Sequence, residues 1–362
     1  MKLITDIDNL PPALSASVSV EERAYIEKIA TRQSLPFAVT PHFASLAGPE
    51  KDDPIRRQFM PDPRETQDDP FALNDPLGES CHRATSRLIH QYRDRALLKT
   101  TGFCSGFCRF CFRRVWVAEK TPFITASELD PVLDYLNAHP EIREILLSGG
   151  DPLTASDERL EWLFQNLRTA NPALSLRICT RLPITAPDRI TAELVGLLRR
   201  FRPLRIAVHI NHPRELSAES RRALTILVEA GIPVLAQTVL LKGINNNAST
   251  LAVLFRECRD LGLIPYYLFQ LDLAPGTAHF RVPLKEGLAL YRELQALEGT
   301  DLKNNSSSVL LLPAYAVDLP GGGGKIRLSD ESIAVEEDRP GGRVYLLKDK
   351  NGKLWPYPAD QA

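Results

Sequence analysis

The chain has 362 residues, of which 44% are hydrophobic and 25% are charged, a composition that excludes collagen, coiled coil and wholesale disorder. Lys and Arg number 44 against 45 Asp and Glu, so the charge gives no reason to expect a nucleic-acid partner or an anionic membrane. No apolar run approaches the ~20 residues of a membrane span, and the N-terminal segment lacks the apolar core of a signal peptide. We therefore expect a cytoplasmic protein whose thiols stay reduced.

Residues 1–95 are rich in proline and aspartate. Residues 20–32 have the spacing of an amphipathic helix, with Ser19 as its N-cap. Repeated Asp-Pro pairs indicate turns and short helix starts rather than strands. Because so many helix and strand breakers prevent a large independent core, we expect a helical or irregular extension that wraps another domain.

From residue 96 onward, short apolar runs alternate with amphipathic segments, which predicts a series of βα units and a parallel sheet. The expected strands are 96–100, 144–148, 174–179, 204–210, 234–240, 266–271 and 309–317. The expected helices are 126–138, 157–166, 191–201, 217–230, 248–261 and 284–297. Because no glycine-rich dinucleotide motif follows the first strand, the pattern favours a full or partial (β/α) barrel over a Rossmann sheet. In such a barrel the chemistry lies on the loops that follow the strands.

Two apolar runs near the end of the chain flank Asn351-Gly352, a strong signal for a β-hairpin. The predicted organisation is therefore a helical or irregular extension (1–95), a (β/α) barrel (96–328) and a β-hairpin tail (329–362). The expected fold class is α/β, and the expected barrel is a partial barrel of the (β/α)6 type.

Three of the six cysteines, Cys104, Cys108 and Cys111, fall within eight residues just after the first expected barrel strand. Thiolates at this C-x3-C-x2-C spacing can bind three irons of a [4Fe–4S] cube and leave the fourth iron open to another ligand. The alternative is zinc, but a closed zinc site takes four ligands, commonly as two pairs. The other three cysteines are scattered, so the spacing favours the iron–sulfur cluster.

Two glycine-rich segments follow expected strands. Gly149 and Gly150 leave room for a small molecule against the backbone, and Asp151 beside them can accept from an amine; an ordinary turn is the alternative. Four glycines precede Lys325. Either they form a flexible surface loop, or they let the lysine reach the barrel mouth as a Schiff-base former.

Taken together, these motifs resemble the lysine 2,3-aminomutase family of radical S-adenosylmethionine enzymes, which also use pyridoxal phosphate. The likeness covers roughly residues 35–350 and is specific, because the cysteines, the Gly-Gly-Asp and the glycine-rich lysine loop occur together in order. Further matching segments are His90-Gln-Tyr92-Arg-Asp-Arg95, Phe112-Arg113-Arg114, His209-Ile-Asn-His-Pro213, Gln237-Thr-Val-Leu-Leu, Pro265-Tyr-Tyr267 with Asp272, His279-Phe-Arg281, and Asp318.

The resemblance implies a role for each matching residue. The implied cluster ligands are Cys104, Cys108 and Cys111. The residues implied to line S-adenosylmethionine are Ser148, Gly149, Gly150, Asp151, His209 and Gln237. The residues implied to bind pyridoxal phosphate are Lys325, as the Schiff-base lysine, and Tyr92 and Arg95 at the phosphate. The residues implied to bind substrate are Arg113 at the carboxylate and Asp272 and Asp318 at the distal ammonium of lysine.

The resemblance implies that the enzyme interconverts L-lysine and β-lysine by way of a 5′-deoxyadenosyl radical and a pyridoxal phosphate aldimine. An electron donor such as flavodoxin or ferredoxin is the implied protein partner, and a homo-oligomer is one option for the assembly. Three alternatives stay open: the same amino shift on another amino acid, β-lysine supply for modifying elongation factor P, and a non-catalytic iron–sulfur or regulatory protein on a decayed barrel. A segment at 299–312, just before Asp318, looks longer than the family's equivalent and leaves the substrate open.

Overall fold

The computed structural model describes residues 2–30, 35–303 and 312–359. The N-terminal region is mostly short helical elements, as expected. They are η1 (Ile7–Asn9), α1 (Pro12–Ala16), α2 (Val20–Ala30), α3 (Pro41–Ser45), α4 (Arg56–Phe59), η2 (Pro63–Thr66) and η3 (Glu79–His82). The helix predicted at 20–32 is confirmed as α2, and Ser19 Oγ accepts from Glu22 N at 3.2 Å. Residues 31 and 32 lie outside the described residues.

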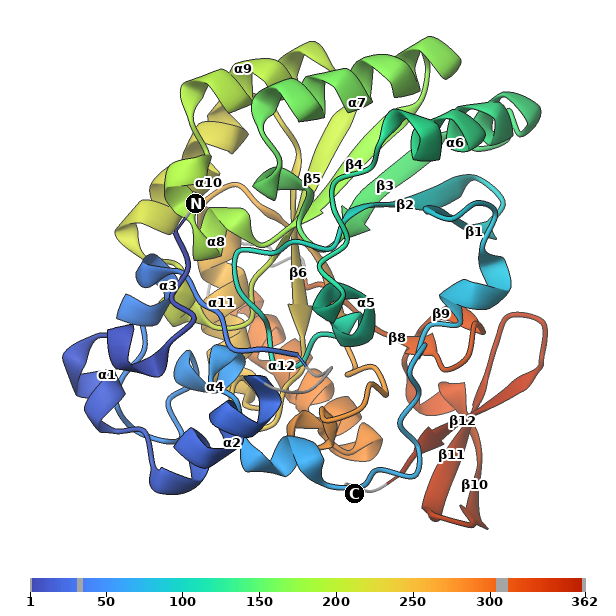
Figure 1. Ribbon diagram of the computed structural model, residues 1–362. Helices are drawn as coiled ribbons and strands as arrows, with labels where there is room; N and C mark the ends of the chain where they lie inside the picture. The colour runs from blue at the N-terminus through green and yellow to red at the C-terminus, as the bar shows by residue number, and fades with distance from the viewer. Residues whose placement is uncertain (1, 31–34, 304–311, 360–362) are drawn as a thin grey trace.

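In the described part of the chain, a nine-stranded sheet follows the order of the sequence from β1 to β9. Strands β2 to β8 run parallel, and long helices on the outside connect them (Figure 1). The parallel strands are β2 (Arg95–Thr101), β3 (Glu144–Gly149), β4 (Ser175–Thr180), β5 (Leu204–His209), β6 (Val234–Val239), β7 (Ile264–Phe269) and β8 (Ala314–Leu319). The connecting helices are α6 (Ala126–Ala138), α7 (Asp157–Ala170), α9 (Ala192–Arg200), α10 (Ala218–Glu229), α11 (Ala248–Asp260) and α12 (Leu284–Lys303). This confirms the predicted partial (β/α)6-type barrel.

Two strands that the sequence did not predict bring the ends of the sheet together. β1 (Leu88–Tyr92) pairs antiparallel with β2, and β9 (Gly324–Arg327) pairs antiparallel with β8. The Tyr92 hydroxyl accepts from the backbone N–H of Lys325 at 2.9 Å, and Gln91 Nε2 donates to the Gly322 carbonyl at 3.1 Å. These side-chain bonds join β1 to the glycine turn before β9 and nearly close the barrel.

The position of β1 differs from the expectation of a helical or irregular region up to residue 95. Only its first two residues are buried, so it lacks the alternation that marks a strand in the sequence. The predicted boundary between residues 95 and 96 therefore falls inside β2, after its first residue, and leaves its partner β1 on the other side. The last barrel strand is Ala314–Leu319 rather than 309–317, and residues 304–311 of the 299–312 segment lie outside the described residues.

The outer helices bury one face each against the sheet. In α7, the residues Leu160, Leu163, Phe164 and Leu167 are fully buried, which is the i, i+3, i+4, i+7 pattern of a helix with one apolar face. The N-terminal extension joins the same core through Leu14, Phe43 and Phe59. The extension therefore packs on the barrel as the sequence predicted.

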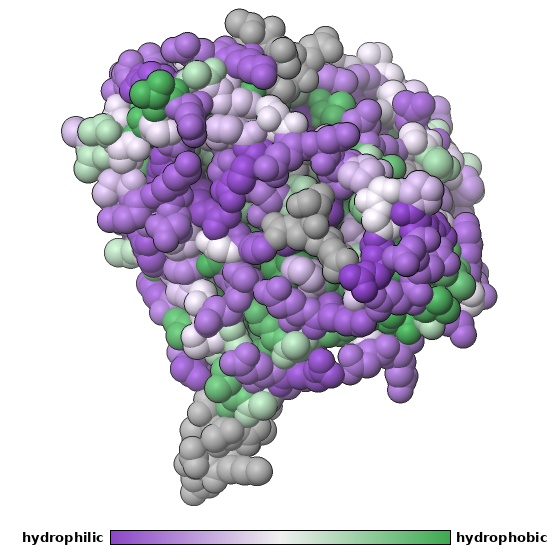
Figure 2. All heavy atoms as spheres, turned by 90° about the horizontal axis from the view of Figure 1, so that it is seen from below, coloured by the Kyte–Doolittle hydropathy of each residue, from purple (hydrophilic) through white to green (hydrophobic). Residues whose placement is uncertain are grey.

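The tail forms a second sheet of three antiparallel strands, β10 (Ile333–Arg339), β11 (Gly342–Lys348) and β12 (Leu354–Pro358). The hairpin predicted at Asn351-Gly352 is confirmed between β11 and β12, while β10 was not predicted. This sheet lies beside β8 and β9 (Figure 1). Hydrophilic residues cover most of the face shown in Figure 2, with hydrophobic residues scattered among them. Among the described helices, none is both long and apolar enough to cross a bilayer.

Candidate active site

A cavity of about 330 Å³ lies inside the barrel toward the carboxyl ends of the parallel strands. Every site residue that the sequence singled out lines this cavity. The structure thus brings together residues from β1, β2, β3, β5, β6, β8 and β9 and from the loops after β2 and β7. A cavity at this end of a (β/α) barrel is where such folds place their chemistry.

The three cysteines lie on the loop between β2 and α5 (Arg114–Ala118), and the N-terminal extension holds this loop. The backbone N–H of Phe107 donates to the Ala38 carbonyl, and that of Arg109 to the Gln58 carbonyl, both at 2.9 Å. The Arg109 side chain is buried and pairs with Glu65 at 2.5 Å. Because both partners are almost wholly buried, removing one would leave an uncompensated charge. The extension therefore fixes the shape of the cysteine loop.

Glu65 is the common anchor of this region, since Arg114 also pairs with it at 2.6 Å. Burial would raise the pKa of the Glu65 carboxyl, but Arg109 and Arg114 outweigh burial and hold the pKa below its usual value. Glu65 is therefore ionised at neutral pH.

The thiols are buried in surroundings that oppose their ionisation. Burial, followed by the neighbouring thiols, raises the pKa of Cys111 to about 11 and that of Cys104 well above its usual range. Such thiols need a bound cation to become thiolates. Within the described ranges, no three His, Cys, Asp or Glu side chains are gathered in the geometry of a single metal ion. A [4Fe–4S] cubane does not require three ligands around one ion, because each of three irons binds its own thiolate.

The Gly-Gly-Asp segment has a packing role that the sequence did not indicate. A Cβ on Gly150 would lie 2.3 Å from the Phe103 carbonyl oxygen, and one on Gly149, whose φ is +109°, would lie 2.7 Å from the Thr101 carbonyl oxygen. The end of β3 thus approaches the segment before the cysteines more closely than any side chain permits. Ser148 and Gly149 end β3 at the cavity wall.

The Asp151 carboxylate is already bonded within the protein. It accepts from Thr180 Oγ1 at 2.8 and 2.9 Å, from the Arg181 N–H at 2.8 Å and from the Leu153 N–H at 3.1 Å. Burial raises its pKa to about 6 although these bonds act in the opposite direction. Asp151 therefore fixes the end of β4, and its contact with an amine of the cofactor stays a prediction.

His209 and Gln237 lie side by side as register partners on β5 and β6. His209 Nε2 is 2.9 Å from Asn211 Oδ1. Burial, and then the charge of Arg181, lower the His209 pKa to about 3, so the ring is neutral at neutral pH. Both residues line the cavity from the barrel wall.

Lys325 is the first residue after four glycines, of which the first three form a tight turn between β8 and β9 and the fourth begins β9. Gly321, Gly322 and Gly324 have positive φ, which other residues rarely adopt. Lys325 Nζ is 3.2 Å from Asp318 Oδ2 and lies 4.0 Å from the ring centre of Phe269. The turn thus delivers the amine into the cavity.

Tyr92 and Arg95 lie beside Lys325 at the β1–β2 turn. The Arg95 guanidinium stacks 4.3 Å from the centre of the Tyr92 ring. Burial, and then Asp318, raise the pKa of Tyr92 to about 12. Because the Tyr92 oxygen accepts from Lys325 N–H, its own proton stays available for donation to an anion such as a phosphate.

Arg113 is held by a residue that the sequence analysis missed. Its Nε and Nη2 donate to Glu79 Oε1 at 2.8 and 2.6 Å, and its Nη1 donates to Ser148 Oγ at 2.9 Å. Lys99 Nζ lies 3.9 Å from the other oxygen of Glu79. Glu79 is on η3, in a region expected to be turns, and no motif pointed to it.

Asp272 and Asp318 come from the loop after β7 and from β8. Burial, and then the charge of Asp318, raise the pKa of Asp272 well above its usual range. The two carboxylates therefore repel one another in a site with little water, which is an arrangement that favours a bound cation.

For three other lining residues the sequence predicted no role. Tyr267 and Phe269 of β7 face the cavity and flank the Lys325 amine, 4.7 and 4.0 Å from their ring centres. Their i, i+2 spacing in a strand could have predicted a shared face. Arg181 follows β4 directly, so the rule that chemistry follows barrel strands could have identified it.

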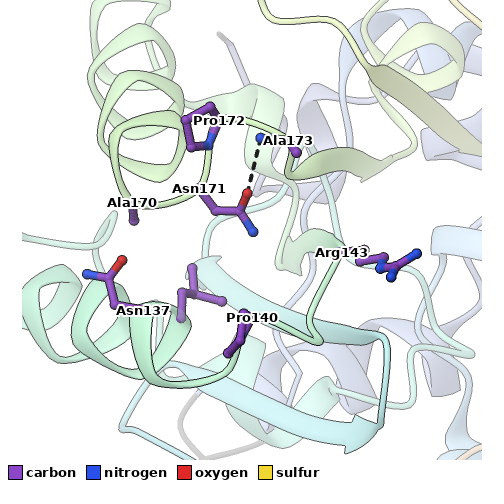
Figure 3. Close-up of a pocket in the computed structure, with 8 residues that line it drawn as sticks. Asn137, Pro140, Arg143, Ala170, Asn171, Pro172 and Ala173 are labelled. Carbon is purple, nitrogen blue, oxygen red and sulfur yellow. Dashed lines mark hydrogen bonds between the residues drawn. The ribbon is translucent and has the colours of Figure 1, made fainter.

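A second hollow, of about 480 Å³, lies at the other end of the strands. Its walls come from the turns that follow α6 and α7, and the Asn171 side chain accepts from the Ala173 N–H at 3.1 Å (Figure 3). Arg143, its one charged lining residue in the described chain, lies apart from the other labelled residues (Figure 3). The amino ends of barrel strands serve stability rather than catalysis, so we place no chemistry there.

Comparison with known proteins defines the class. The model of the Radical SAM superfamily matches residues 98–252, so this segment is a radical S-adenosylmethionine domain. It is 44% identical over 284 residues to a putative L-lysine 2,3-aminomutase of Treponema pallidum, covering 78% of this chain and 77% of that protein. It is 37% identical over 294 residues to the L-lysine 2,3-aminomutase of Clostridium subterminale, covering 81% of this chain and 68% of that protein.

A third relative has a different substrate in its name. The glutamate 2,3-aminomutase of Clostridioides difficile is 33% identical over 352 residues, covering 97% of this chain and 79% of that protein. The chain belongs to the lysine 2,3-aminomutase family and is an isomerase with amino-acid 2,3-aminomutase activity.

The residues present fit the cofactors of this class. A radical S-adenosylmethionine enzyme uses a [4Fe–4S] cluster and S-adenosylmethionine, and three cysteines whose thiols need a cation line the cavity beside the glycine edge of β3. Lysine 2,3-aminomutases also use pyridoxal phosphate. A lysine amine, a tyrosine hydroxyl and an arginine at one end of the cavity are consistent with that cofactor.

Proposed function

We propose that this protein is an L-lysine 2,3-aminomutase, which moves the amino group of L-lysine from C2 to C3 to give β-lysine. The observation that supports lysine is the pair of carboxylates, Asp272 and Asp318, in one cavity with Arg113. Paired carboxylates stabilise a cationic side chain and repel the side-chain carboxylate of glutamate.

The charge balance at Lys325 supports the same substrate. The Lys325 ammonium is the counter-ion of Asp318 in this structure, at 3.2 Å. When the Lys325 nitrogen is committed to pyridoxal phosphate, it no longer neutralises Asp318. Asp318 then needs another cation, because a charge in a site with little water is costly without a partner. The distal ammonium of lysine meets that need.

Arg113 is the proposed anchor at the other end of the substrate. Three of its five N–H groups donate to Glu79 and Ser148, which leaves one N–H on each terminal nitrogen. Two such donors form a fork that suits a carboxylate. Arg113 and Lys99 carry two positive charges, and Glu79 carries one negative charge. The net charge of these three side chains is therefore +1, which one substrate carboxylate would neutralise.

The cluster and S-adenosylmethionine, when bound, supply the 5′-deoxyadenosyl radical that removes a hydrogen from C3 of the substrate. The chain's own task is to hold C3 in place and to keep water away. Phe110 and Leu271 line the cavity and are 5% and 1% exposed. Apolar walls of this kind exclude water from the site and protect a reactive species from side reactions.

Replacing Asp318 with Asn should weaken lysine binding at least about tenfold, because one charge-assisted hydrogen bond is worth roughly 1.5–3 kcal/mol and about 1.4 kcal/mol is one decade. Binding of an amino acid without a side-chain cation, such as norleucine, should weaken less. The measurement is the dissociation constant of each amino acid for both proteins under anaerobic conditions.

Equal losses for lysine and norleucine would show that Asp318 does not recognise the ammonium. Anaerobic turnover of a panel of amino acids with product identification tests the assignment itself. β-Lysine as the main product supports it, and β-glutamate as the main product overturns it.

Glu79→Ala should weaken binding of lysine about tenfold, because Arg113 loses the carboxylate that fixes its orientation. Lysinamide lacks the carboxylate that Arg113 is proposed to bind, so its affinity should change little. Glu119→Ala, an exposed glutamate at the end of α5, is the matched control. Parallel losses for lysine and lysinamide would contradict a role through Arg113.

A further inference from the structure

Arg181, directly after β4, contacts one of the cluster cysteines. Its Nη1 donates to Cys108 Sγ at 2.9 Å. Its Nη2 donates to Glu215 Oε2 at 3.0 Å and to Gln58 Oε1. The residue is 7% exposed, so a guanidinium charge is buried directly against a sulfur proposed to bind iron.

The guanidinium is held on several sides. The backbone N–H of Arg181 donates to Asp151, and the guanidinium carbon lies 4.8 Å from the ring centre of Phe43 and 5.5 Å from that of Phe110. Cation–π contacts of this kind stabilise a desolvated arginine. Arg181 therefore has a fixed position relative to Cys108.

Glu215 and Gln58 form the support behind Arg181. Glu215 is fully buried and accepts from Gln58 Nε2 at 2.9 Å and from the Asn211 N–H at 3.1 Å. Gln58 belongs to α4 in the N-terminal extension. The extension that holds the cysteine loop thus also holds the arginine that contacts it.

A cluster that gains an electron becomes more negative, and a nearby positive charge stabilises that reduced form. The effect is stronger where the local dielectric is low, and hydrogen bonds to cluster sulfurs and the net charge around them set reduction potentials. An arginine keeps its charge even when buried. His209 nearby is neutral, so it adds no second positive charge.

We propose that Arg181 raises the reduction potential of the [4Fe–4S] cluster through its hydrogen bond to Cys108, with Glu215 and Gln58 as the residues that position it. The step affected is the transfer of one electron from an external one-electron donor, such as a reduced flavoprotein or ferredoxin, to the oxidised cluster. No bond forms or breaks in that step. The proposal depends on the cluster and not on lysine as substrate.

The test is a redox titration of the anaerobically reconstituted protein, with the reduced cluster followed by electron paramagnetic resonance. Arg181→Met should shift the midpoint potential to a more negative value. Arg181→Lys, which keeps the charge, should shift it less. Glu215→Gln keeps the shape but removes a negative charge behind Arg181, so it should shift the midpoint in the positive direction. Arg200→Met, at an exposed arginine on α9, is the control.

Iron content and circular dichroism separate a change of potential from loss of the cluster or the fold. An Arg181→Met protein with full iron and the parental midpoint overturns the proposal. If that variant does not hold iron, Arg181→Gln decides, because it keeps an N–H donor for Cys108 but removes the charge, and a parental midpoint there overturns the proposal equally. Because the titration needs no substrate, its outcome is independent of whether the enzyme acts on lysine.

Discussion

Changing any one of Cys104, Cys108 or Cys111 to Ala should abolish reductive cleavage of S-adenosylmethionine. The cysteine loop offers one thiol for each of three irons, so no spare ligand on the loop replaces a lost one. The reaction requires the cluster as its electron carrier, and we therefore expect 5′-deoxyadenosine formation to fall below detection rather than to slow. The measurement is anaerobic chromatography of the nucleoside product together with the iron content of each variant.

Cys81 provides the control for this series. It is exposed, and Cys81→Ala should keep both iron and cleavage. Cys179 also lines the cavity, on β4 rather than on the loop, so the double variant Cys108→Ala/Cys179→Ala tests whether it substitutes. Full cleavage in Cys108→Ala that is retained in the double variant would show that Cys108 does not hold the cluster, whereas cleavage lost only in the double variant would show that Cys179 substitutes.

Much of the barrel was predictable because its strands and helices have clear periodicity. The α7 helix shows why: four buried residues at helical spacing appear in the sequence as an apolar stripe. The strands β1 and β9 carry no such signal. β1 buries only its first two residues, and β9 begins in a run of glycines, so only their pairing with β2 and β8 makes them strands.

In the candidate site, too, some residues could be predicted from the sequence and others could not. The cysteines, the Gly-Gly-Asp and the lysine loop could be predicted because each is compact in the sequence and follows a predicted strand. Glu79 and Gln58 could not, because their importance arises from contacts with Arg113 and Arg181, which are 34 and 123 residues away in the chain. Residues that orient other residues have no sequence signature of their own.

The bonding partners of the Asp151 carboxylate also could not be predicted from the sequence. The sequence suggested an acceptor for an amine, whereas the structure has it bonded to Thr180 and to the backbone of Arg181. A carboxylate beside two glycines is compatible with either use, and the distinction depends on how β4 packs against β3. By holding Arg181 in place, Asp151 connects the glycine edge to the cysteine loop.

Replacing Lys325 with Ala should remove the covalent linkage between the protein and pyridoxal phosphate, and with it aminomutase turnover. Among the described residues that line the cavity, Lys325 is the one lysine. Its amine lies over Phe269 and Tyr267 and 3.2 Å from Asp318, so it reaches the cavity beside the Tyr92 hydroxyl and Arg95 proposed for the phosphate. A lysine so placed is the expected nucleophile toward the cofactor aldehyde.

Borohydride treatment followed by peptide mass spectrometry tests this prediction directly. In the parent, the reduced cofactor should be attached to Lys325, and the absorbance of the bound cofactor should be lost on reduction. Lys325→Ala should show neither signal while keeping its iron, because the cysteine loop is built from other elements. Lys285→Ala, at an exposed lysine, should behave as the parent. Attachment of the cofactor to any other lysine of the parent would contradict the prediction. The four-glycine turn would then have only a structural role, which is to connect β8 to β9 around Trp355. A Cβ on Gly323 would lie 2.7 Å from the Trp355 ring, so glycine is required there for packing alone.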